Sequence, residues 1–158
     1  MVYKNFLKEK DFKHLEDIMF TGGNFFPWYI NPIVGPHDKQ SQLVHLFYYN
    51  DKINSRFFKD LMPVLNLLKP NKLLRIKANL YMKAATIVEH GYHIDFPRAE
   101  VITAILYLNS NNGYTRFKEG KKIKSERNKL LKFTGKQSHT SSTCTDKEYR
   151  SVINFNYQ

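Results

Sequence analysis

Residues 100–118 read EVITAILYLNSNNGYTRFK, and this stretch decides the fold class. Residues 100–109 form a run rich in β-branched and aliphatic residues, and residues 113–118 form a second, shorter run. The polar segment between them, Ser110 to Asn112, has the composition of a turn. The spacing predicts two strands joined by a short connection.

The same pattern extends over the whole second half of the chain. Strand-like runs separated by turn residues cover residues 73–81, 89–96, 100–109, 113–118, 121–125, 129–134 and 149–157. Many short strands at regular spacing are typical of a β-sandwich or a jelly roll. We therefore predict a mainly β fold.

The first part of the chain has a different pattern. Apolar residues recur at helical spacing in residues 3–20, and Thr21-Gly22-Gly23 is expected to end that helix. Residues 43–49 are predicted to form a strand, and residues 55–68 a helix that Pro63 kinks or interrupts. These helices are expected to pack on one sheet of the β body.

Length and composition indicate one globular domain spanning residues 1–158. We expect residues 1–72 to act as a helical support region and residues 73–158 to form the core. The single cysteine, Cys144, cannot form an internal disulfide, which fits a reducing compartment, and it is expected to be a small buried hydrophobe. We find no signal peptide and no membrane-spanning run, so a cytoplasmic protein with no membrane partner is the expectation.

The net charge of +11 is partly local. Residues 116–132 carry eight Lys or Arg against two Glu, which gives this segment a charge of +6. A basic face of this kind can attract nucleic acid or another polyanion. The alternative is a solvated, lysine-rich hairpin.

Residues 89–96 read EHGYHIDF and contain two of the six histidines. On a strand, His93 and Asp95 would point to the same face, and such a pair suits a divalent transition metal. The pair alone is a weak signal, because an ordinary surface pair has the same spacing. His90 has the opposite parity and is expected to pack or to form hydrogen bonds. His139 is the best candidate for a third ligand.

The order of these motifs resembles a known family. HxD at residues 93–95 is followed by TAILYLN (103–109), NGYTRF (112–117), NKLLKF (128–133), His139 and then Arg150. This series resembles the Fe(II)- and 2-oxoglutarate-dependent dioxygenases, and within them the prolyl hydroxylase-like branch. The N-terminal half, with FPWYI and RIKANLY, resembles small phage-type members. The resemblance implies a double-stranded β-helix, or jelly roll.

The resemblance also implies roles for particular residues. His93, Asp95 and His139 would hold Fe(II), and Arg150 would pair with the distal carboxylate of 2-oxoglutarate. Tyr107 would donate its hydroxyl to that carboxylate. Tyr81 and Asn79 are further candidates for contact with the co-substrate. Dioxygen would be the oxidant, and ascorbate a reductant of the iron.

The implied activity is the hydroxylation of a peptidyl residue, including a prolyl one, or of a small molecule, with release of succinate and carbon dioxide. The alternative is a non-catalytic jelly-roll module that uses its basic hairpin, residues 116–132, to bind nucleic acid or an acidic partner. Oxidation of nucleic acid ranks lower, because the sequence lacks an obvious second arginine after Arg150.

Two groups of side chains have two interpretations each. Arg75, Lys77, Asn79 and Tyr81 share one face of their strand, which either lines a site or is a solvated outer face. The aromatic residues Phe26, Trp28 and Tyr29 either belong to the core or form a wall that contacts substrate. His45, in an aromatic strand, is expected in the core.

Overall fold

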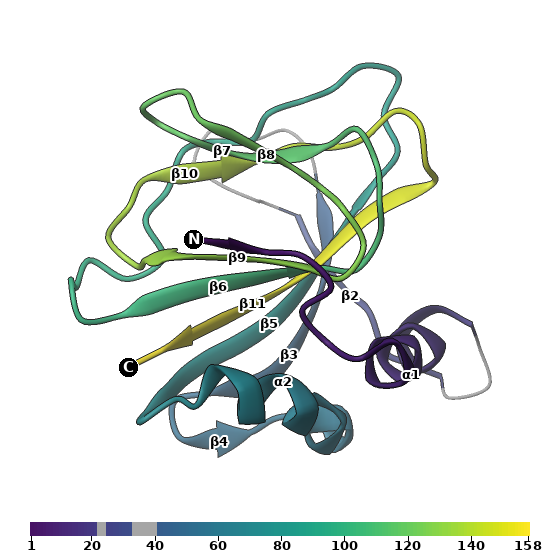
Figure 1. The fold of residues 1–158 in the computed structure, drawn as a ribbon. Coiled ribbons are helices and arrows are strands. Elements are labelled where there is room, and N and C mark those ends of the chain that lie inside the picture. Colours follow the sequence, from purple (N-terminus) through teal and green to yellow (C-terminus); the bar gives the residue numbers. More distant parts are fainter. Residues whose placement is uncertain (22–24, 33–40) are drawn as a thin grey trace.

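The computed structural model describes residues 1–21, 25–32 and 41–158 and contains two antiparallel sheets (Figure 1). The large sheet has the order β1-β9-β6-β11-β5-β3-β2, with β4 paired to β3, and the small sheet has the order β10-β7-β8. The elements are β1 (Val2–Tyr3), α1 (Glu9–Phe20), β2 (Tyr29–Asn31), β3 (Gln42–Tyr49), β4 (Lys52–Ile53), η1 (Arg56–Leu61), α2 (Met62–Leu68), β5 (Leu73–Met82), β6 (Ile102–Tyr107), β7 (Tyr114–Phe117), β8 (Lys122–Lys124), β9 (Lys129–Thr134), β10 (His139–Ser141) and β11 (Tyr149–Tyr157).

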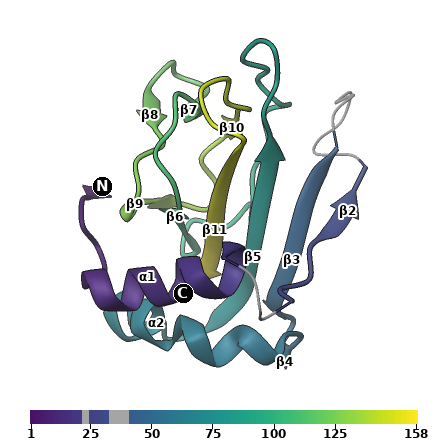
Figure 2. The same cartoon turned by 90° about the vertical axis from the view of Figure 1, so that its right-hand side faces the viewer.

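The large sheet is covered on both faces. The helices lie on its outer face, and the small sheet lies over its inner face (Figures 1 and 2). Phe12 and Leu15 of α1 belong to the same buried cluster as Ile76 of β5 and Phe155 of β11. Because neighbouring residues of a strand point to opposite faces, the alternate residues of β5 and β11 face the small sheet. The predicted mainly β fold with helices on one sheet is confirmed.

The helices begin later than the sequence pattern indicates. Residues 2–3 form β1, which pairs with β9, and α1 starts at Glu9. The predicted helix 55–68 is a 3₁₀ helix followed by α2, and Pro63 lies in the first turn of α2. Proline is favoured there, because its missing N–H would have no partner in the helix anyway. Gly22 and Gly23 lie outside the described residues.

The prediction of a strand at residues 89–96 is wrong. This segment pairs with the chain around β10 only through isolated bridges, Glu89 with Ser142 and His93 with His139. Between these bridges, the Thr140 hydroxyl donates to the His90 carbonyl at 2.6 Å. A side chain thus takes a backbone acceptor that a regular ladder would use. Strands β1, β2, β4 and β10 were not predicted.

The N-terminal region does more than cover the sheet. Strand β3, predicted at residues 43–49 and found at Gln42–Tyr49, pairs with β5 along most of its length.

None of the described helices has the length and apolar character that a membrane-spanning helix requires.

Candidate metal and co-substrate site

A cavity of about 220 Å³ lies on the inner face of the large sheet. Arg75, Lys77, Asn79 and Tyr81, at alternate positions of β5, all line it. The neighbouring strand β11 contributes Arg150, Val152 and Asn154, which stand opposite Tyr81, Asn79 and Lys77 in the pairing register. The polar face of residues 75–81 is therefore the wall of a cavity and not a solvated outer face.

The three residues predicted as metal ligands meet at this cavity. Candidate ligand atoms of His93, Asp95 and His139 all lie within 4.8 Å of one another. The backbone brings the histidines together, because the His93 amide donates to the His139 carbonyl at 2.9 Å and the His139 amide donates back at 3.0 Å. Their ring centroids are 4.5 Å apart. One imidazole on each chain segment and one carboxylate form a face that could hold a divalent transition metal.

Backbone carbonyls orient both imidazole rings. Nδ1 of His139 is 3.0 Å from the Gln137 carbonyl oxygen, and Nδ1 of His93 is 3.3 Å from that of Gly91. A proton on each Nδ1 can be donated there, which leaves Nε2 as the lone-pair donor for a metal. Burial lowers the pKa of His139, and the neighbouring His93 adds to this effect. The neutral, metal-binding form of His139 is thereby favoured.

The Asp95 carboxylate is held by three side chains from three strands. Arg75 of β5 donates to Oδ1 at 2.8 Å. Thr103 of β6 and Asn156 of β11 each donate to Oδ2 at 3.1 Å. Asn156 also accepts from Arg75 at 3.0 Å and donates to Thr103 at 2.9 Å, so the three supports contact one another.

This arrangement determines the charge state of Asp95. Burial alone would raise its pKa, but Arg75, the two histidines and Asn156 outweigh burial and hold the pKa at about 2. The carboxylate is therefore ionised and fixed in orientation before any metal binds, which is what a metal ligand requires.

Arg150 lies on the same cavity, and its side chain is fully buried. Nε donates to Ser125 Oγ at 2.7 Å and Nη2 donates to Thr115 Oγ1 at 3.2 Å. Nη1 has no hydrogen-bond partner among the described residues, and no described carboxylate pairs with the guanidinium. A buried guanidinium with a free donor is a receptor for an anionic group, because an uncompensated buried charge is costly.

Gly113 makes room for this guanidinium. A Cβ atom at residue 113 would lie 2.6 Å from Arg150 Cδ and 2.6 Å from the Thr143 carbonyl oxygen. No real Cβ atom makes such contacts, so a side chain there would displace either Arg150 or the backbone.

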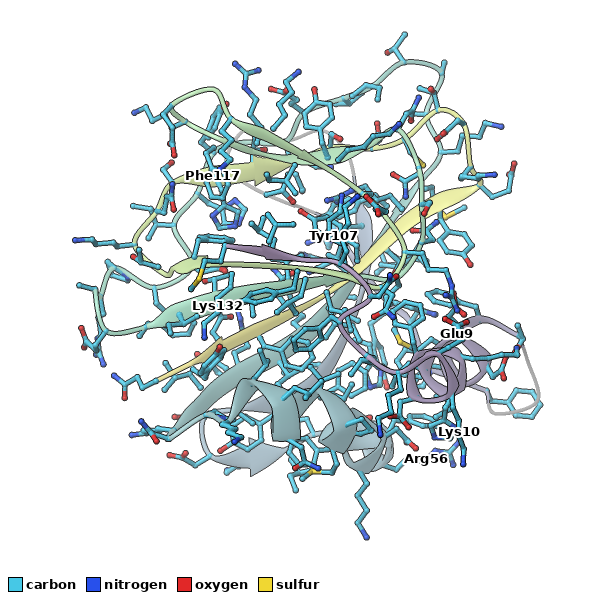
Figure 3. All side chains as sticks on the ribbon, viewed as in Figure 1. Glu9, Lys10, Arg56, Tyr107, Phe117 and Lys132 are labelled. Atoms are coloured by element: carbon cyan, nitrogen blue, oxygen red, sulfur yellow. The ribbon has the colours of Figure 1, made fainter. Side chains whose placement is uncertain are left out.

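Tyr107 reaches this end of the site indirectly. Tyr107 lies between the two sheets (Figure 3). Its hydroxyl donates to Thr115 Oγ1 at 2.8 Å. Burial raises the pKa of Tyr107 to about 12, so the group is a neutral donor. Thr115 accepts from both Tyr107 and Arg150, and its own hydroxyl proton is available to a third group. Thr115 lines the cavity, whereas Tyr107 does not.

The other candidates divide between cavity and core. Tyr81 and Asn79 line the cavity, and the Tyr81 hydroxyl accepts from Ser141 at 2.9 Å. His90 is buried and stacks on Tyr81 with ring centroids 4.9 Å apart. The predictions that His90 packs in the interior, that Cys144 is buried and that His45 lies in the core are confirmed. Nδ1 of His45 lies 2.7 Å from the Pro27 carbonyl oxygen, and its Nε2 lies 2.7 Å from Ser55 Oγ.

The aromatic residues Phe26, Trp28 and Tyr29 lie in two different environments. Phe26 and Trp28 pack against the main core cluster, whereas Tyr29 is exposed and lines a second cavity with Phe25, away from the His93 site.

Sequence analysis missed four residues of the site, Thr103, Thr115, Ser125 and Asn156. The alternation along β6 and β11 places Thr103 and Asn156 on the same face as Tyr107 and Arg150, and this was the available signal.

Comparison with models of protein families and with curated proteins finds no match. Solved structures do match. A prolyl-4-hydroxylase from Pseudomonas putida has a TM-score of 0.65 and 14% identity, with 100% of this chain and 91% of that chain covered. A prolyl hydroxylase from Trichoplax adhaerens, in complex with a peptide of the hypoxia inducible factor oxygen degradation domain, has a TM-score of 0.67 and 14% identity over 99% and 82% of the two chains.

A third similar structure comes from small-molecule biosynthesis. The α-ketoglutarate-dependent (2-oxoglutarate-dependent) non-heme epimerase SnoN from nogalamycin biosynthesis has a TM-score of 0.70 and 11% identity, covering 100% of this chain and 76% of that chain. These likenesses define the class of fold. The chain has the jelly-roll fold of the prolyl hydroxylase-like 2-oxoglutarate oxygenases, as the motif order predicted.

Proposed function

We propose that this protein is an Fe(II)- and 2-oxoglutarate-dependent dioxygenase, with residues 1–158 acting as one domain. The observation that carries the proposal is the pairing of two features on one cavity. His93, Asp95 and His139 can bind a metal at one position, and a buried, uncompensated Arg150 can bind a carboxylate at another. A dicarboxylate that chelates a metal through one end needs both features.

In this proposal, His93, Asp95 and His139 hold the iron. Bound iron would supply dioxygen activation and the oxidative decarboxylation of 2-oxoglutarate to succinate and carbon dioxide. Arg75, Asn156 and Thr103 keep the Asp95 carboxylate ionised and turned toward the histidines, as their hydrogen bonds indicate. Preorganised ligands of this kind raise metal affinity.

The other end of the cavity would bind the distal carboxylate of 2-oxoglutarate. Arg150 offers Nη1 to it, while Ser125 and Thr115 hold the guanidinium in place. Thr115 can donate its own proton to the same carboxylate, because Tyr107 already fills its acceptor site. Tyr81 and Asn79 complete the wall on β5. Tyr107 thus acts through Thr115 in this arrangement.

The oxidised substrate is a peptidyl group, including prolyl, or a small molecule. The similar solved structures include both a peptide-bound prolyl hydroxylase and a small-molecule epimerase. The alternative of a polyanion-binding module has less support. Of the eight cations between residues 116 and 132, Arg116 and Lys122 pair with Glu89, Arg127 pairs with Glu9 and Glu16, and Lys129 pairs with Glu126.

The test is succinate formation from 2-oxoglutarate by anaerobically purified protein supplied with Fe(II), ascorbate and air. We expect slow succinate release without added substrate and none from His139→Ala. His14→Ala is the matched control, because His14 is an exposed histidine on α1 that pairs with Asp60 and lies outside the site. Equal turnover by wild type and His139→Ala would refute the assignment. Binding to a polyanion that weakens steeply with salt, without any succinate, would favour the alternative.

A further inference from the structure

Lys77 is a cation that the proposed chemistry does not use. It lies in the middle of β5 on the inner face, between Arg75 and Asn79, and it lines the cavity. Unlike Arg75, which is bound to Asp95 and Asn156, Lys77 forms no hydrogen bond or ion pair with any residue that the structure describes. Its side chain is half-buried, and withdrawing a lysine from water without a partner is costly, so its position on the cavity wall favours an anionic ligand.

The charges that line the cavity do not balance. Among the described residues that line it, Arg75, Lys77 and Arg150 are cationic and Asp95 is the one carboxylate, which leaves two surplus positive charges on this part of the lining. Fe(II) and the 2-oxoglutarate dianion carry equal and opposite charges, so binding both of them leaves the surplus unchanged. A positive cavity after the metal and co-substrate are bound attracts an anion.

The neighbours of Lys77 suit a polar ligand. Asn154 stands opposite Lys77 in the strand register, and its Oδ1 is buried without a hydrogen-bond partner among the described residues. Gln42, at the β3 side of the same cavity, also has a buried amide oxygen without such a partner. An amide can present either its oxygen or its NH₂ group, so these two side chains can contact an anion or its polar substituents.

We infer that Lys77 is the anchor for an anionic substrate, so that the substrate carries a carboxylate or phosphate group which binds beside Asn154. This inference rests on the proposed function and specifies its substrate class. Burial and the charge of Arg75 lower the pKa of Lys77 to about 8, so the ammonium is still mainly protonated near pH 7 and can form an ion pair.

The experiment uses the Zn(II)-loaded protein with N-oxalylglycine, an analogue of 2-oxoglutarate that cannot be decarboxylated. Inorganic phosphate is the probe anion. Acetic anhydride labels the lysines at pH 7.5, and mass spectrometry measures the rate at each lysine. We expect phosphate to slow labelling of Lys77 at least fivefold and to leave Lys52, an exposed lysine on β4, unchanged. Calorimetry should show at least tenfold weaker phosphate binding in Lys77→Gln but not in Lys52→Gln.

Two results would overturn the inference. In the first, phosphate neither protects Lys77 nor binds more weakly to Lys77→Gln. In the second, Lys77→Gln weakens N-oxalylglycine binding tenfold, which would assign the lysine to the proximal carboxylate of the co-substrate. The phosphate titration is then repeated on metal-free protein that carries Arg150→Met, which removes the guanidinium proposed to bind 2-oxoglutarate. This measurement separates failure of the present inference from failure of the proposed function. If the protein binds neither Zn(II) nor N-oxalylglycine, but Lys77→Gln still weakens phosphate binding, the anion site exists and the proposed oxygenase function is wrong.

Discussion

Replacing Asp95 by asparagine should change the acid stability of the metal-free protein by a predictable amount. The pKa of Asp95 is about 2 in the folded protein, against 3.8 for an ordinary aspartate. A lowered pKa stabilises the folded state above pH 3.8, and this contribution disappears as the pH falls through 2. The difference between these two pKa values corresponds to about 2 kcal/mol at neutral pH.

The same two pKa values give the pH dependence. The contribution of Asp95 to the free energy of unfolding is still about 2 kcal/mol at pH 5, but it falls to about 1 kcal/mol at pH 3. At pH 3 the carboxylate is mostly protonated in the unfolded chain, and the pH is close to its folded pKa. An asparagine side chain cannot titrate, so the difference in unfolding free energy between wild type and Asp95→Asn should narrow by about 1 kcal/mol from pH 5 to pH 3. Titrating groups far from the site change both proteins alike, and their contribution cancels in this difference.

The measurement is urea denaturation in the presence of a chelator, followed by the fluorescence of Trp28, at pH 5, 4 and 3. Arg75→Met is the matched background, because the Arg75 charge is the strongest influence that lowers the pKa of Asp95. In that background the narrowing should be smaller. A difference between wild type and Asp95→Asn that stays constant from pH 5 to pH 3 would show that Asp95 is not held in its ionised form by these neighbours.

Two other substitutions test packing and ion pairing. Gly113→Ala should cost about 1–3 kcal/mol in unfolding free energy and weaken N-oxalylglycine binding to the Zn(II)-loaded protein, because the new Cβ overlaps Arg150 Cδ and the Thr143 carbonyl oxygen. Unchanged thermal denaturation and unchanged affinity would contradict this close approach. Arg127→Met should lower the unfolding free energy by about 1 kcal/mol at low salt and by less at 0.5 M NaCl, because Arg127 donates to Glu9 and Glu16 of α1 through bonds of 2.6–2.9 Å. A loss of stability that does not depend on salt would instead assign the role of Arg127 to packing on Phe12.

Strand periodicity in the sequence predicted most of the architecture. Strand-like runs separated by turn residues located β3, β5, β6, β7, β8, β9 and β11. This pattern failed at residues 89–96, where the Thr140 side chain and two isolated bridges replace a regular ladder. Short edge strands such as β1 and β10 are too short to show a period.

The candidate ligands were predictable from residue type and order, and their supports were not. His93, Asp95, His139 and Arg150 follow from a motif series along the chain, and the structure brings the first three within 4.8 Å of one another. Thr103, Thr115, Ser125 and Asn156 are common polar residues, and strand alternation shows the face of Thr103 and Asn156 but not what they contact. Their importance comes from contacts with residues at least eight positions away in the chain.

The sequence by itself therefore determined the kind of elements, the parity of each side chain and the set of residues capable of metal and carboxylate binding. Only the tertiary structure decided which strands are neighbours, and with that which polar side chains meet. The order β6-β11-β5 places Thr103, Asn156 and Arg75 around one carboxylate, and it places Lys77 beside Asn154 on the cavity wall. The physical reason is that periodicity depends on neighbours in sequence, whereas the charge balance of a cavity depends on strands far apart in the chain.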